Sequence, residues 1–135
     1  MKAERIFLFL MTAVWLPYGL FCLAQPAFLE TAAGLALDST TADTEVRAMY
    51  GGLQAAIGAL SLAGALRPSL ARPALVMLAF LFAGLFSGRA IGMIMNADFS
   101  AYTVGAVIFE AMGFGFGAKL AAQAGSSPQA DLASS

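Results

Sequence analysis

The sequence contains no histidine, a single cysteine and few charged residues. Without histidine the chain cannot build a Ser-His-Asp triad, a Cys-His pair, most zinc sites or a His-ligated haem site. Cys22 is the only cysteine, so neither an internal disulfide nor a Cys-x-x-Cys motif can form. Any catalysis would therefore depend on carboxylates, arginine, tyrosine or hydroxyl groups, and we expect no metal and no cofactor.

Charge is scarce in relation to the size of the chain. Of the 135 residues, 11% are charged and 60% are hydrophobic, whereas soluble domains carry about 25% charged residues. A water-soluble globule of this length would lack the charges to solvate its surface. The formal net charge of -1, with no long basic cluster, also argues against nucleic acid as a partner. The composition predicts one domain in a lipid bilayer.

Four apolar segments extend over residues 6–24, 48–66, 74–94 and 101–122. Each is close to the roughly 20 residues that a helix needs to cross a bilayer, and no strand-like alternation competes with them. We therefore predict an all-α fold, a four-helix transmembrane bundle that occupies residues 1–124. A short interfacial helix is expected around residues 28–37, and the polar residues 125–135 are predicted to be a disordered tail.

The charges separate by side when the chain is drawn with four crossings. One side holds Lys2, Arg5, Arg67, Arg72 and Lys119. The other side holds Glu30, Asp38, Asp43 and Asp98. Because basic residues favour the cytoplasmic side of a membrane, we predict a multi-pass protein of the bacterial inner (cytoplasmic) membrane with both termini in the cytoplasm.

Small residues recur at close to helical spacing in three of the apolar segments. Membrane helices associate through close packing and polar contacts, so glycines mark surfaces where backbones approach each other. The predicted packing positions are Gly52, Gly84, Gly88, Gly92, Gly113 and Gly117. We expect them to serve tight packing inside the bundle, a homo-oligomer or a larger membrane complex, with a ligand groove as the alternative.

A few ionisable residues fall at membrane depth, where an unpaired charge is costly. Arg89 and Glu110 both lie roughly 9 to 13 Å below the outer surface, at 1.5 Å per residue, which makes them natural partners. Gln54 enters at a similar depth. Glu45 and Arg47 are two residues apart at the mouth, so each needs a partner elsewhere. The predicted outer polar cluster is Glu45, Arg47, Tyr50, Gln54, Arg89 and Glu110.

Three interpretations of the cluster are open. Arg89 and Glu110 can be a structural pair that fixes helix register, with Gln54 completing the hydrogen bonds. They can instead line a pocket for the carboxylate, phosphate or hydroxyl head group of a hydrophobic ligand. The third interpretation is catalysis or proton transfer through Glu110. No second inner carboxylate is placed to complete an acid/base pair.

Several motifs are distinctive: Thr44-Glu-Val-Arg-Ala-Met-Tyr-Gly-Gly-Leu53, Ser87-Gly-Arg-Ala-Ile-Gly92, and Tyr18-Gly19-Leu20 with Pro26. With Glu110, they make the chain resemble the bacterial membrane family catalogued as domain of unknown function 4345, up to about residue 120. Asn96-Ala-Asp98 departs from the tighter Asp-Gly-type turn expected there. The resemblance implies a four-helix membrane fold and no particular activity.

The leading functional hypothesis is a noncatalytic binding protein, or a scaffold or accessory subunit, whose partners are the bilayer, a lipid-like ligand or other subunits. The alternative is a lipid- or isoprenoid-modifying membrane enzyme that uses Glu110 and Arg89. A small transporter is a weaker alternative, because four helices are few for alternating access unless the protein forms an oligomer.

Overall fold

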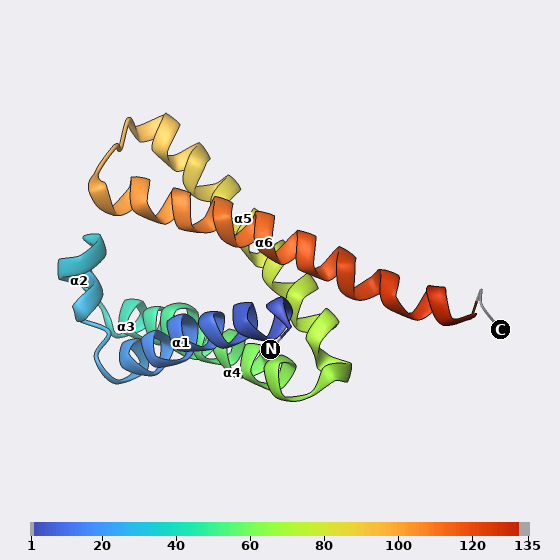
Figure 1. Ribbon diagram of the computed structural model, residues 1–135. Coiled ribbons are helices and arrows are strands. Elements are labelled where there is room, and N and C mark those ends of the chain that lie inside the picture. The colour runs from blue at the N-terminus through green and yellow to red at the C-terminus, as the bar shows by residue number, and fades with distance from the viewer. Residues whose placement is uncertain (1, 133–135) are drawn as a thin grey trace. The chain divides into compact units, whose positions relative to one another are not determined.

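The computed structural model describes the backbone of residues 2–132 and the side chains of residues 2–125. That range contains helices and no strand, so the predicted all-α fold is confirmed. Figure 1 shows the elements in chain order. They are α1 (Ala3–Ala24), α2 (Phe28–Ala33), α3 (Thr40–Val46), the π-helix η1 (Arg47–Gly52), α4 (Leu53–Leu66), α5 (Pro68–Asn96) and α6 (Ala101–Leu132).

Four helical spans are long and apolar enough to cross a bilayer, as predicted: Ala3–Ala24, Thr40–Leu66, Pro68–Asn96 and Ala101–Gly125. The second span is continuous through α3, η1 and α4. It begins at Thr40 instead of near residue 48, and the third begins at Pro68 instead of near residue 74. The reason is that hydropathy detects only the apolar part of a helix, whereas the helix itself begins at its capping residue.

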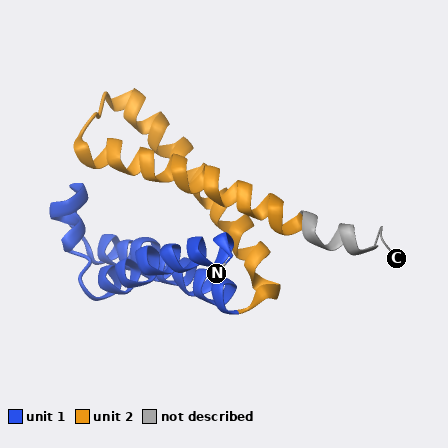
Figure 2. Ribbon diagram, in the orientation of Figure 1, with its two compact units in different colours: residues 1–66 blue, residues 67–135 orange. Residues whose placement is uncertain are grey.

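The chain divides into two compact units, Met1–Leu66 and Arg67–Ser135 (Figure 2). In the first unit α1 packs along η1 and α4, and in the second α5 packs along α6. The assembly of the four spans into one bundle and the cytoplasmic position of both termini stay predictions. The predicted disordered tail, residues 125–135, lies almost entirely beyond the side chains that the structure describes and stays a prediction as well.

In the first unit, two glycines bring helix backbones into direct contact. A Cβ atom added to Gly19 would lie 2.3 Å from the backbone nitrogen of Ala55. A Cβ atom added to Gly58 would lie 2.4 Å from the backbone nitrogen of Leu16. Neither distance leaves room for a methyl group, so α1 and α4 approach each other as closely as membrane helices can through small residues.

The second span starts at a polar cap and contains a wide turn. The side-chain oxygen of Ser39 accepts a hydrogen bond from the Ala42 N–H at 3.1 Å, which begins α3. Residues Arg47–Gly52 then form the π-helix, a rare geometry that is frequent at functional sites. Gly51 in this turn is buried, and an added Cβ atom would lie 2.6 Å from Cγ of Leu23. The wide turn is therefore held against the end of α1.

The connection between α1 and α3 contains a short helix, and its apolar side chains pack in a cluster with residues of α1 and α3. The helix α2 ends at Gly34, whose φ of 66° lies in the left-handed region that favours glycine. Cys22, Leu29 and Val46 form the buried centre of the cluster. Partly buried side chains complete it: Tyr18, Ala33, Leu35, Leu37 and Tyr50. A short helix is thus present in the predicted region, but it is shorter than residues 28–37, and its position at the membrane interface stays a prediction.

In the second unit, the predicted packing glycines separate into two groups. An added Cβ atom at Gly113 would lie 2.6 Å from the ring of Phe82, and one at Gly117 would lie 3.5 Å from the backbone of Ala79. These two glycines lie in the α5–α6 contact. The other group is Gly84, Gly88 and Gly92, where an added Cβ atom would meet no atom of the described residues within 4 Å. These three glycines therefore do not contact α6, and the prediction that another helix packs against them remains a prediction.

Candidate functional site

Arg89 on α5 and Glu110 on α6 form the central polar contact of the second unit. Nε and Nη2 of Arg89 both lie 2.9 Å from Oε1 of Glu110. The Arg89 side chain is 30% exposed, whereas the Glu110 side chain is 4% exposed. The sequence predicts these residues as partners, and the structure places them in contact. The arginine therefore reaches in from the edge to a carboxylate that lies inside the hairpin.

The second carboxylate oxygen of Glu110 lies in a different environment. Oε2 is buried and has no hydrogen-bond partner within the described part of the chain. Buried polar atoms are nearly always hydrogen-bonded, and a buried acceptor without a donor costs about 1 to 3 kcal/mol. Two arginine nitrogens converge on Oε1 instead of dividing between the two oxygens as a bidentate pair does. The geometry leaves one strong acceptor available.

One aromatic ring contacts Arg89, and two others pack between the same helices. Cζ of Arg89 lies 6.0 Å from the ring centroid of Tyr102, within range of a cation–π interaction. Phe82 meets Phe109 edge to face, with centroids 5.4 Å apart. Since Gly113 has no side chain, the Phe82 ring fits directly against α6. These ring contacts pack α5 against α6 in the same unit that holds the Arg89–Glu110 pair.

A polar cap at the start of α6 fixes the short connection that brings Arg89 and Glu110 together. The Thr103 hydroxyl donates to Oδ2 of Asp98 at 2.5 Å, and the Ser100 N–H donates to Oδ1 of Asp98 at 3.0 Å. The Ser100 hydroxyl oxygen accepts from the Thr103 N–H at 3.3 Å. The Thr103 hydroxyl, followed by the Ser100 N–H, holds the pKa of Asp98 below its usual range. A charged Asp98 is thus part of the helix start.

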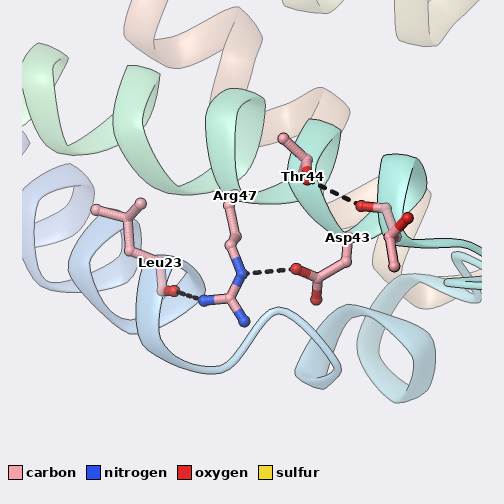
Figure 3. Close-up of polar contacts among 5 residues, drawn as sticks. Leu23, Asp43, Thr44 and Arg47 are labelled. Atoms are coloured by element: carbon pink, nitrogen blue, oxygen red, sulfur yellow. Dashed lines mark hydrogen bonds and ion pairs between the residues drawn. The ribbon is translucent and has the colours of Figure 1, made fainter.

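Arg47 has a structural contact in the first unit. Its Nε donates to Oδ2 of Asp43 at 2.7 Å, and its Nη1 donates to the carbonyl oxygen of Leu23 (Figure 3). Leu23 is in the last turn of α1, where carbonyl groups lack partners within the helix and a positive charge is favourable. The sequence predicts that Arg47 needs a partner other than Glu45. The structure shows two such partners, Asp43 on its own span and the Leu23 carbonyl at the end of α1.

The other members of the predicted cluster have separate positions. Glu45 is exposed on α3, Gln54 is half-buried on α4, and Tyr50 packs in the apolar cluster around Cys22. Glu45, Arg47, Tyr50 and Gln54 belong to the first unit, whereas Arg89 and Glu110 belong to the second. A single polar layer that includes all six residues stays a prediction.

Two contacts were missed by the sequence analysis. Asp43 lies four residues before Arg47, a spacing that places opposite charges side by side on a helix and should have identified the pair. Tyr102 was not assigned to the site, although it lies two turns before Glu110 on the same helix. Because an aromatic residue in a membrane helix usually packs against lipid or other side chains, no sequence signal distinguishes this one.

Among the described residues, the groups shown in contact at the site are the Glu110 carboxylate, the Arg89 guanidinium group and the Tyr102 phenol ring. Among the described residues, no group of three His, Cys, Asp or Glu side chains is close enough to hold a metal ion. Glu110 is the one carboxylate whose contact with Arg89 is shown. Such a site can neutralise charge inside a membrane span and can accept a hydrogen bond.

Comparison with known proteins identifies a family. No curated protein and no solved structure matches the chain. A family model described as "Domain of unknown function (DUF4345)" matches residues 3–118, from the start of α1 into α6, a range that contains both Arg89 and Glu110. Four apolar helices indicate a multi-pass membrane protein. This chain therefore belongs to the DUF4345 family.

Proposed function

We propose that this chain is a noncatalytic membrane protein that acts by binding a lipid-like molecule or a partner subunit at the Arg89–Glu110 pair. The observation that carries the proposal is the unequal environment of the two Glu110 oxygens, one held by Arg89 and the other buried without a partner in the described residues. A pair that served only to hold two helices together would satisfy both oxygens. In this pair, Oε2 of Glu110 is available to accept a hydrogen bond from a ligand or a partner subunit.

Binding is favoured over catalysis by the composition of the site. General acid–base chemistry requires a group that donates a proton and a group that accepts one, each within hydrogen-bonding reach of the substrate. Arginine does not give up its proton in proteins, so the Tyr102 phenol, whose ring centroid lies 6.0 Å from Cζ of Arg89, is the one further described group at the site that could exchange a proton besides Glu110. A lipid- or isoprenoid-modifying enzyme that uses the same two residues is the second candidate, and one experiment separates the two.

Native mass spectrometry of the full chain, purified in a mild detergent, tests the proposal together with lipid extraction and identification of co-purified proteins. The wild-type protein should carry a bound lipid-like molecule or a partner subunit in a fixed ratio, and Glu110→Gln should retain a smaller fraction of it. The matched control is Ser87→Ala, because the Ser87 hydroxyl donates to the Ala83 carbonyl of its own helix at 2.7 Å and is exposed. This variant should retain what the wild type binds.

Two results would contradict the proposal. Wild-type protein that carries no molecule, and that captures no partner when it is cross-linked in its native membrane, would exclude a binding function. A bound lipid that the wild type converts to a product, and that Glu110→Gln binds without converting, would establish the enzyme instead.

A further inference from the structure

We infer that the ligand of the Arg89–Glu110 site carries a neutral hydroxyl group on an apolar chain, and that this hydroxyl donates a hydrogen bond to Oε2 of Glu110. The inference depends on the proposed binding function, and it narrows the ligand to one chemical class. It is carried by a buried acceptor atom that no described residue satisfies.

The charge balance of the site selects a neutral ligand. Arg89 already compensates the charge of Glu110, with two nitrogens 2.9 Å from Oε1. An anionic head group, such as a carboxylate or a phosphate, would bring a second negative charge against Oε2 in a medium of low dielectric constant. An ammonium group would leave a net positive charge inside the membrane span, which is also costly. A hydroxyl group donates a hydrogen bond and adds no charge.

The geometry of the site selects a small polar end. The Glu110 residue is 3% exposed, so the surrounding side chains must open to admit any ligand group. A hydroxyl requires the least opening of the common donors, because it presents one oxygen and one proton. An amide or a sugar would need room for several further polar atoms, each of which would require its own partner.

An apolar chain has a surface beside the pair on which to lie. At about 100° per residue, Gly88 is roughly a quarter turn from Arg89 on α5, and Gly84 and Gly92 continue the same strip. An added Cβ atom at any of the three would meet no atom of the described residues within 4 Å. The strip does not by itself indicate a ligand, but it gives the chain of a hydroxyl-bearing ligand a smooth apolar path beside Arg89, whose side chain reaches Glu110.

The test compares three probes that share one chain length: 1-hexadecanol, its methyl ether and hexadecanoic acid. Each is added to delipidated full-length protein in detergent, and the fraction bound is measured by native mass spectrometry. The alcohol should bind about tenfold more tightly than the ether, which is the size of one hydrogen bond to a charged acceptor. The acid should bind more weakly than the alcohol.

Two variants assign the preference to Oε2. In Glu110→Gln the amide oxygen should face Arg89, which can only donate, so an NH₂ group takes the place of Oε2. The preference for the alcohol over the ether should then fall to within about twofold, because the ether oxygen can accept from that group. Ser87→Ala, which changes a hydroxyl on the same helix, should keep the wild-type preference.

A second measurement needs no variant. Glu110 is the buried glutamate among the described residues, so in wild-type protein labelled with ¹³C-glutamate its carboxylate band should keep its frequency when H₂O is replaced by D₂O, unlike the bands of water-exposed glutamates. This band should shift in the infrared spectrum when 1-hexadecanol is added, and it should not shift with the methyl ether. The measurement stands even where Glu110→Gln fails to accumulate.

The possible outcomes distinguish the inference from the proposed function. Equal binding of the three probes with an unshifted band would show that water satisfies Oε2, and tighter binding of the acid would show an anion site. A preference for the ether would show that Glu110 itself donates. Each of these results overturns the inference of a hydroxyl ligand and leaves the proposed binding function standing. A native ligand that lacks a hydroxyl group would do the same. Failure of all probes, with no native ligand and no partner subunit, overturns the proposed function as well.

Discussion

Arg47 donates a hydrogen bond to the main-chain carbonyl of Leu23, which precedes it by 24 residues and lies in the last turn of α1. The contact crosses from the π-helical turn of the second span to the end of the first span. It satisfies a carbonyl that α1 cannot satisfy itself and places a positive charge at the negative end of the helix dipole. Arg47 is therefore a structural link within the first unit.

Replacing Arg47 should destabilise the first unit more than removing its ion pair does. Arg47→Met loses the bond to the Leu23 carbonyl and the bond to Asp43, and we expect a loss of about 1 to 2 kcal/mol in the free energy of unfolding. Asp43→Ala removes only a pair whose side chains are 42% and 39% exposed, so its cost should stay below about 1 kcal/mol. Thermal unfolding in detergent measures both, and equal costs would contradict a role for Leu23.

The Arg89–Glu110 pair should show strong coupling in a double-mutant cycle. Glu110→Leu alone removes the carboxylate that compensates the Arg89 charge in a membrane span, at a cost of about 3 kcal/mol or more. Arg89→Met together with Glu110→Leu removes both charges, and we expect much less loss than the two single variants add up to. The unfolding free energies of the four proteins provide the measurement. Additive losses would show that the pair contributes no coupling.

Glycine-to-alanine substitutions should separate contact glycines from open ones. Gly19→Ala and Gly58→Ala place a methyl group within 2.4 Å of backbone atoms, which cannot yield as a flexible side chain does. We expect each to destabilise the protein by about 1 to 3 kcal/mol. Gly84→Ala and Gly88→Ala meet no described atom within 4 Å and should leave thermal stability unchanged or raise it by up to about 1 kcal/mol, because alanine favours a helix more than glycine does.

The same alanine variants test the predicted oligomer. Size-exclusion chromatography with light scattering should show a smaller assembly for Gly88→Ala if the open glycine strip packs against a second copy. An assembly of unchanged size would show that the open glycine strip is not part of an oligomer contact, whether or not the substitution changes thermal stability.

Substitutions at two left-handed helix ends should change the stability in opposite directions. Ala97 ends α5 with φ 50° and ψ 37°, a left-handed conformation that costs an alanine about 1 kcal/mol. Ala97→Gly should therefore raise the stability by up to about 1 kcal/mol, whereas Gly34→Ala, at φ 66°, should lower it by a similar amount. Thermal unfolding checks both signs. A loss of stability in Ala97→Gly would mean that the alanine side chain has a packing role.

The cap at the start of α6 should make stability depend on pH in the acid range. The Thr103 hydroxyl and the Ser100 N–H lower the pKa of Asp98 from its ordinary value of 3.8. Since the folded pKa lies below the unfolded one, the contribution of Asp98 is fully present above the unfolded value and is lost as the pH falls through the folded value. Thr103→Val should shrink this acid-dependent loss of thermal stability.

The control for this prediction is Asp43→Asn, which removes a carboxylate outside the cap. Its acid profile should keep the contribution of Asp98. A wild-type protein whose unfolding temperature is the same above and below pH 3.8 would contradict the proposed role of the cap.

The sequence predicted the helices of this protein better than their ends or their contacts. Four apolar segments identified four spans, because the hydrophobic requirement of a bilayer leaves a strong signal in composition. The start of the second span was placed eight residues late, since the polar turn from Thr40 onward has no such signal. The partnership of Arg89 and Glu110 was predicted correctly from depth and charge. The Leu23 carbonyl could not be predicted as an acceptor for Arg47, because any residue supplies a backbone carbonyl, whereas Asp43 could have been identified from its spacing.

The sequence by itself determined that the chain is all-helical, that it has four apolar spans, and that Arg89 and Glu110 are partners. These properties follow from local composition and from the constant rise of a helix. Only the tertiary structure decided which glycines are contact points and which Glu110 oxygen Arg89 holds. Both depend on how one helix is rotated about its axis relative to its neighbour. Side-chain packing between the two helices sets this rotation, so it cannot be read from the sequence of either helix alone.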